Sequence, residues 1–193
     1  MVLHTSKNYE EELENLRTRV MTMGGRVESQ VRLAILSYSE ENIQLAQQVL
    51  VNEREINQEQ LATDQMCSEV IARRQPAAKD LRLLLGVIRT ISDLERIADQ
   101  AAKIAKLVIR NENRGSLPRI HGIFQAAEMA MTMLRKALDA FTREDGQAAR
   151  EVMGSDSELD QQYIASMRQL ITYMMEDPRT IGAALDDLRV AKA

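Results

Sequence analysis

The sequence predicts an all-α protein made of two tandem antiparallel three-helix bundles, with the last helix truncated. Helix-favouring Ala, Leu, Glu, Gln and Arg are abundant, and only eight Gly and three Pro interrupt the 193 residues. Apolar residues recur at three- and four-residue spacing, as they do on one face of a helix. This pattern of helices and turns then occurs a second time, which predicts two copies of one unit.

The first two expected helices are defined by two apolar stripes. The first stripe runs from Leu13 to Ile35, and Ser39 follows it as a potential N-cap for the next helix. Two glutamates after this serine would lie in the first turn, where acidic side chains are favourable. The second stripe runs from Ala46 to Val70. Together the stripes predict a helical hairpin.

A third helix should follow the hairpin. The second helix should end near Gln75, because Pro76 cannot continue it but suits the first turn of a new helix. The third stripe runs from Leu81 to Ala105. Residues 111–118, with the sequence NENRGSLP, combine the features of a linker and are expected to end the first unit.

The second half of the chain repeats the first at a constant offset of 103 residues. The matched positions are Ala34 with Ala137, Ile35 with Leu138, Ala46 with Ala149, Val49 with Val152, Ile56 with Leu159 and Asn57 with Asp160. At an offset one residue shorter, Asp177 and Pro178 take the place of Gln75 and Pro76, as N-cap and first helical residue. Three helices joined by short turns bury their stripes as an antiparallel bundle.

These features place the first three-helix bundle at residues 8–113 and the second, incomplete at its C-terminus, at residues 117–193. The third helix of the second copy starts at Pro178 and ends at Ala193, whereas its counterpart should continue to about Ile109. The part without a counterpart carries the segment LERIAD, residues 94–99. We interpret this difference as truncation or processing of the chain rather than as a natural domain end.

Composition excludes several classes of protein. The formal net charge is −4, and basic residues alternate with acidic ones, so no basic stripe for nucleic acid is expected. Cys67 is the sole cysteine, which excludes an internal disulfide and suits a reducing compartment. The sequence has neither an apolar stretch of membrane-spanning length nor a signal-peptide pattern. We therefore expect a cytoplasmic protein without direct membrane insertion.

Acidic side chains stand where the stripes call for apolar residues. They form three pairs spaced four residues apart, and each pair shares a helix face. The pairs are Glu53/Asn57 in the second stripe, Glu95/Asp99 in the third, and Asp156/Asp160 in the second copy. Across the hairpin, the first two pairs should lie at the same height. Such a cluster is costly without a counter-charge, which predicts a bound Mg, Mn or Ca ion, or iron or another transition metal.

Another interpretation of these acids needs no metal. Basic side chains close in sequence could neutralise some of them, and a glutamate at the edge of a stripe can extend to solvent at little cost. The candidate partners are Arg54, Arg89, Arg96 and Lys103. The shared height and the repetition in the second copy favour the metal site, with Asp156/Asp160 as a half-site whose facing residues would lie beyond Ala193.

Four segments resemble one known family. They are residues 16–25 (LRTRVMTMGG), 71–76 (IARRQP), 93–99 (DLERIAD) and 170–181 (LITYMMEDPRTI). Together they closely resemble the PhoU family of bacterial phosphate-signalling accessory proteins, over nearly the whole chain from about Glu10.

The resemblance implies metal clusters held by paired Glu/Asp-x-x-x-Asp motifs. These map here to Glu95/Asp99 and Asp156/Asp160, with Glu53/Asn57 as a variant. The bound ion would be Mg, Mn, Fe or Zn. A further family motif, of unassigned role, maps to Asp80 and Arg82. The chain departs from the family pattern in two ways: Ala98 replaces a usual Gly, and the second Glu-Arg-Ile-Gly-Asp segment is absent, which weakens the expectation of a second full cluster.

The resemblance also implies a function. We expect a non-enzymatic, metal-binding signalling adaptor that negatively regulates the phosphate-starvation response and modulates high-affinity phosphate uptake. Its implied partners are the phosphate transporter ATPase subunit, a phosphate-sensing histidine kinase and a second copy of itself in a homodimer. Two alternatives stay open from the residues: a carboxylate-bridged metal enzyme or metal-storage bundle, and a helical scaffold that binds no metal.

Overall fold

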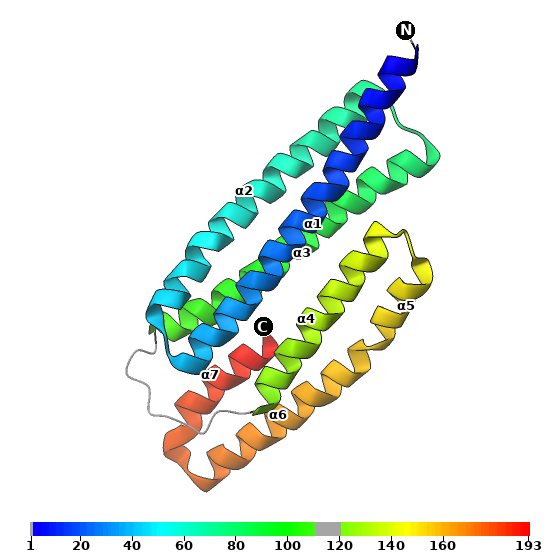
Figure 1. Cartoon of the computed structure of the whole chain (residues 1–193). Coiled ribbons are helices and arrows are strands. Elements are labelled where there is room, and N and C mark those ends of the chain that lie inside the picture. Colours follow the sequence, from blue (N-terminus) through cyan, green and yellow to red (C-terminus); the bar gives the residue numbers. More distant parts are fainter. Residues whose placement is uncertain (1, 111–120) are drawn as a thin grey trace.

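The computed structural model describes residues 2–110 and 121–193, with side chains from residue 7 onward in the first range and from residue 122 in the second. The described residues form seven α-helices and one 3₁₀ turn, and no strand occurs among them. Two helical bundles lie side by side with their long axes roughly parallel (Figure 1). The predicted all-α fold of tandem helical bundles is confirmed. The predicted linker, and with it the expected boundary between the two domains, lies outside the described residues.

The first bundle consists of three long antiparallel helices, α1 (Val2–Glu40), α2 (Ile43–Arg74) and α3 (Ala78–Arg110). Their apolar stripes meet along the whole length of the bundle. One end of the core includes Leu16, Val20 and Ile91, and the other includes Ala34, Ala46 and Ala105. All of these side chains are almost fully buried.

The turns of the first bundle differ in part from the prediction. The N-cap of α2 is Asn42, whose side-chain oxygen accepts from the amide of Leu45, so the assignment to Ser39 is wrong. The hydroxyl of Ser39 instead donates to the carbonyl of Leu36, because α1 continues to Glu40. At the other end α2 stops as predicted, with Gln75 in the left-handed conformation at φ 48°.

The second bundle consists of α4 (His121–Thr142), α5 (Gly146–Gly154), α6 (Asp156–Glu176), the 3₁₀ turn η1 (Pro178–Thr180) and α7 (Ile181–Lys192). The sequence repeat predicts that the second bundle has one continuous helix as the counterpart of α2. The structure instead divides this helix at Ser155 into α5 and α6. Gly154 and Ser155 are weak helix formers, which accounts for the break. The start of the third helix is as predicted, because the Asp177 side chain caps the amide of Arg179 after Pro178.

Helix α4 packs against α1 and joins the two bundles. At Gly24 on α1 the contact is so close that a Cβ atom would collide with the side chain of Leu138 on α4. Polar side chains of the two bundles also contact one another at both ends of the interface. At one end, the hydroxyl of Tyr38 donates to the buried carboxylate of Asp187 on α7. At the other end, the carboxylate oxygens of Glu144 lie 2.8 Å from Nη2 of Arg17 and 2.9 Å from Nζ of Lys79.

Candidate functional site

The pairs Glu53/Asn57 and Glu95/Asp99 of the first bundle lie at matching heights on antiparallel helices. Glu53 precedes Pro76 by 23 residues and Asp99 follows it by 23, so the hairpin of α2 and α3 brings their levels together. Glu53, Asn57, Glu95 and Asp99 are all half-buried. They therefore lie between the apolar core and solvent, and not as deeply as the buried apolar residues on either side of them in the stripes.

The same pairs do not form a ready coordination shell. Within the described ranges, no group of three or more His, Cys, Asp or Glu side chains is arranged to hold a metal ion. The carboxylate of Asp99 has a different partner, the ammonium of Lys103, at 2.9 Å. Of the suggested basic neighbours, Arg96 pairs with Asp93 at 3.4 Å, and both side chains are exposed. In this arrangement the donor set does not fit a metal cluster, and metal binding stays a prediction.

The third pair lies in a different setting. Asp156 is the first residue of α6, where a carboxylate interacts favourably with the helix dipole, and it is exposed. Asp160, also exposed, stands at the edge of a cavity between the bundles. The two acids thus lie on one helix, and among the described residues they belong to no group that could hold a metal ion.

A buried amide near the first two pairs was not predicted. Gln30 on α1 has an exposed fraction of 0%, and its amide nitrogen donates to the carbonyl of Ala98 on α3 at 3.1 Å. Its oxygen has no hydrogen-bond partner. An unpaired buried acceptor costs about 1–3 kcal/mol, so this position is a point of local strain beside Asp99. A glutamine inside the apolar stripe of the first helix was the signal that could have identified it.

The family-motif residues Asp80 and Arg82 lie at the start of α3, at the end of the first bundle. Asp80 occupies the first turn and is close to Tyr9 of α1. Burial first, and then the neighbouring Asp80, raise the pKa of the Tyr9 hydroxyl. Nearby, Arg74 binds both oxygens of Glu12 at 3.0 and 3.1 Å, and this ion pair lowers the pKa of Glu12. Asp80 therefore belongs to a polar cluster with side chains of α1 and α2, whereas Arg82 is exposed.

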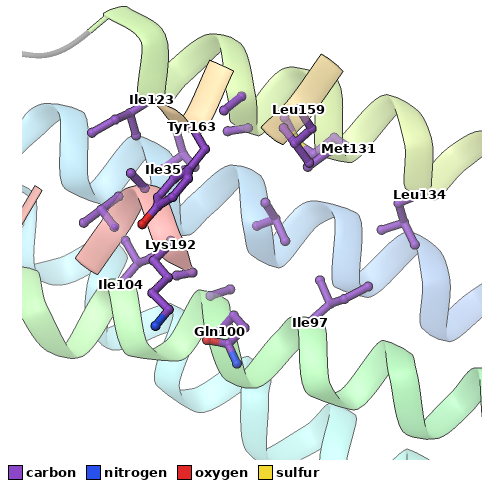
Figure 2. A pocket seen from close by; sticks show the side chains of 18 of the residues that line it. Ile35, Ile97, Gln100, Ile104, Ile123, Met131, Leu134, Leu159, Tyr163 and Lys192 are labelled. Atoms are coloured by element: carbon purple, nitrogen blue, oxygen red, sulfur yellow. The ribbon is translucent and has the colours of Figure 1, made fainter. Parts of the chain in front are cut away.

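An apolar groove lies between the bundles, and we call it the interbundle groove. One part is a cavity of about 600 Å³ with walls from α1, α3, α4 and α6. A second cavity of about 770 Å³ continues it toward the turn between α4 and α5, and both cavities are lined by Asp93, Ile97 and Leu134. Figure 2 shows Ile35, Ile97, Ile104, Met131, Leu134 and Leu159 around the first cavity.

The groove offers an apolar binding surface with a polar edge. Its floor and walls are Ala, Ile, Leu and Met side chains, whereas Arg96, Asp160 and Lys192 are among the charged side chains that line it. A surface of this kind suits an apolar face of another helix or molecule better than a charged metabolite. Sequence reasoning did not find the groove, since it depends on how the two bundles dock.

This chain is similar to a known family model and to several known proteins. A family model described as the PhoU domain matches residues 20–108 and 123–193. Proteins named phosphate-specific transport system accessory protein PhoU, or its homolog, are similar over almost the whole chain. One from Pseudomonas putida is 42% identical over 94% of this chain and 72% of its own length. One from Escherichia coli K12 is 39% identical over 98% of this chain and 79% of its own length.

Solved structures agree with the fold. The crystal structure of PhoU from Pseudomonas aeruginosa matches with a TM-score of 0.90 and 38% identity, and the match covers 95% of this chain and 88% of that one. The phosphate transport system regulatory protein PhoU from Streptococcus pneumoniae matches with a TM-score of 0.82, at 24% identity over 95% of this chain and 90% of that one. At that identity the second match bears on the fold alone.

Proposed function

This chain belongs to the PhoU family, and from that premise we propose that it is a non-enzymatic accessory protein that regulates phosphate transport and signalling. The observation that carries the proposal is the match over nearly the whole chain to relatives named as phosphate-specific transport accessory proteins. The first segment matched by the family model runs from Val20 in α1 to Val108 in α3, and the second runs from Ile123 in α4 to Ala193. The match therefore includes helices of both bundles.

In this proposal the protein acts through its surfaces rather than through a catalytic centre. It negatively regulates the phosphate-starvation response by binding the ATPase subunit of the phosphate transporter and a phosphate-sensing histidine kinase, as a cytoplasmic protein that forms a homodimer. By binding one state of each partner better than another, it shifts their populations. No helix in the described parts of the chain is long and apolar enough to cross a membrane.

The proposal is tested in a bacterium that lacks its own accessory protein of this family. Expression of the 193-residue chain should restore repression of a phosphate-starvation reporter in high phosphate, and purified chain should retain the transporter ATPase and the kinase in a pull-down. A Leu16→Asp variant, which places a charge in the first core, serves as the unfolded control. Normal binding of both partners without any restored repression would contradict the regulatory role.

Metal binding stays a separate prediction. Elemental analysis of protein loaded with Mn, Fe or Zn should show less bound metal in Glu53→Ala and Asp99→Ala variants, with unchanged helical circular dichroism. Lys103→Ala is the matched control, because it removes the ion-pair partner of Asp99 and keeps all four oxygen donors. Equal metal content in all variants would remove the site assignment and leave the regulatory proposal intact.

A further inference from the structure

Two adjacent glycines lie in the middle of α1, and contacts within the chain account for one of them only. A Cβ atom at Gly24 would lie 2.4 Å from the side chain of Leu138 on α4, so the docking of α4 requires glycine there. At Gly25, which is exposed, nothing lies within 4 Å of the place that a Cβ atom would take. No glycine of the described residues has a positive φ, so the backbone does not require glycine at this position either. Gly25 therefore weakens the helix without a compensating contact among the described residues.

Gly25 borders a polar cleft between α1 and α2, which we call the glycine cleft and which has a volume of about 410 Å³. The residues that line it include Thr22, Gly25, Arg26 and Ser29 of α1, and Asn52 and Glu55 of α2. The cleft lies between the middle parts of these two long helices, whereas α7 packs against α3, α4 and α6. Its shape is therefore set by α1 and α2 of the first bundle.

The hydroxyl groups of the cleft use their protons within α1. The hydroxyl of Thr22 donates to the carbonyl of Thr18 at 2.9 Å, and the hydroxyl of Ser29 donates to the carbonyl of Gly25 at 3.0 Å. Each hydroxyl oxygen then has only acceptor lone pairs to offer a ligand. These groups suit a ligand that donates hydrogen bonds better than an anion.

The charged groups of the cleft leave an excess of negative charge. The guanidinium of Arg26 lies 3.6 Å from the carboxylate of Glu55 and 3.7 Å from that of Glu59, and both distances are longer than a hydrogen bond. Oε2 of Glu59 is buried and has no hydrogen-bond partner, which is unfavourable for an acceptor. The side chain of Glu55 is 60% exposed. One guanidinium is thus shared by two carboxylates, and a second cation could bind Glu55 from solvent.

We propose that the glycine cleft receives one basic side chain, arginine or lysine, from a partner protein whose backbone approaches α1 closely at Gly25. The incoming N–H groups bind the carboxylate of Glu55, and Arg26 is then left to pair fully with Glu59. Glycine is the residue that permits such a close approach to a helix backbone. This inference goes beyond the proposed function, since it is measured without any component of phosphate transport.

The test is an NMR titration of the full 193-residue protein with the peptide acetyl-Gly-Arg-Gly-amide. The amide signals of Gly25, Arg26 and Ser29 should shift saturably, with a Kd in the millimolar range, because a single side chain is bound. The same peptide with glutamine in place of arginine should cause no saturable shift. Absence of saturable shifts at these amides with the arginine peptide overturns the proposal.

Matched charge variants on α2 locate the binding site. Glu55→Lys reverses the charge that faces the ligand and should abolish the saturable shifts. Glu69→Lys makes the same change at another exposed position of α2, four turns away, and should leave the Kd unchanged. If Glu55→Lys and the unaltered protein bind the arginine peptide equally well, the proposal is wrong.

The two glycines provide a test that separates binding from folding. Gly25→Gln places a better helix former at the edge of the cleft, so it should raise the thermal midpoint by about 2 °C and abolish the shifts of Arg26 and Ser29. Gly24→Ala should lower the midpoint, because its Cβ collides with Leu138, and should leave the Kd unchanged. A lower midpoint for Gly25→Gln would show that folding requires this glycine, and it would overturn the proposal, as would unchanged binding by this variant.

The oligomeric state distinguishes another protein from a second copy of the chain as the source of the basic side chain. We expect the mass measured by sedimentation to be the same for the unaltered protein and for Glu55→Lys. If the mass of the unaltered protein rises with concentration and Glu55→Lys abolishes this rise, the cleft is an interface between copies and the proposed partner is wrong.

Discussion

The apolar stripes of the first bundle are buried along its whole length, whereas those of the second bundle are buried at one end only. Helix α3 has 33 residues and covers α1 and α2 throughout, whereas α7 has 12. Long stripes of α1 and α2 are buried, but the buried residues of α5 and α6 are Ser166 and Leu170 alone. The two repeats share their pattern of apolar positions, and the stripe is covered where α3 or α7 lies over it.

The difference shows that an apolar pattern does not by itself determine how deeply its side chains are buried. Hydrophobic stabilisation is proportional to the apolar area removed from water, so equal residues contribute unequally in the two repeats. The second bundle depends correspondingly more on its contacts with the first. Its contacts include α4 against α1 and the polar contacts at both ends.

The largest expected change in stability comes from replacing an apolar side chain by alanine at matched positions of the two repeats. Ile56→Ala removes a fully buried side chain and should lower the free energy of unfolding by about 2–5 kcal/mol. Leu159→Ala, at the matched position of the second repeat, should cost about 1 kcal/mol, because the side chain is already half-exposed. Urea unfolding followed by circular dichroism measures both. Equal losses would show that the two stripes are equally covered.

A smaller effect is expected at the contact between the bundles. Tyr38→Phe removes the hydroxyl that donates to the buried carboxylate of Asp187, which should destabilise the protein by about 1–2 kcal/mol. The loss should appear as faster amide exchange in α7 more than in α2. Tyr173→Phe is the control, since its hydroxyl meets only the exposed side chain of Gln169 and its removal should change stability by less than about 0.5 kcal/mol. Faster exchange in α2 alone would contradict this role.

The smallest effect concerns Glu144 at the opposite end of the interface. Lys79, and to a lesser extent Arg17, lower the pKa of this carboxyl below its ordinary value of 4.5. A lowered pKa stabilises the folded state above 4.5, and this stabilisation is lost as the pH falls through the lowered value. Glu144→Gln should therefore lower the thermal midpoint slightly at pH 7 and have no effect at pH 2. A larger effect at pH 2 than at pH 7 would contradict the ion pair.

Much of the fold could be predicted from the sequence because local rules and helical periodicity agree there. Pro76 marks the helix end at Gln75, Asp177 is a clear N-cap before Pro178, and the recurring offset identifies two repeats. The cap at Asn42 was misplaced because Ser39 satisfies the same local rule three residues earlier. The break at Ser155 was missed because the offset with the unbroken α2 suggested continuity.

The site was harder to predict because it depends on side-chain partners and on docking. Spacing places Glu53 and Asp99 at one height, but it does not say that Asp99 pairs with Lys103. The interbundle groove arises from the docking of α4 against α1, and no periodicity within a single helix contains that information. The unpaired oxygen of Gln30 likewise depends on the neighbours that surround it in the folded bundle.

The central claim is that one stripe is covered and its repeat is open, and thiol labelling measures this directly. Cys67 is buried in the first bundle, and burial raises its pKa to about 11, so it should react with a thiol reagent only after unfolding. A cysteine introduced by Leu159→Cys, in a Cys67→Ala background, should react in the folded protein, more slowly than a free thiol because the position is half-buried. Protection of both cysteines in the folded protein would contradict the account.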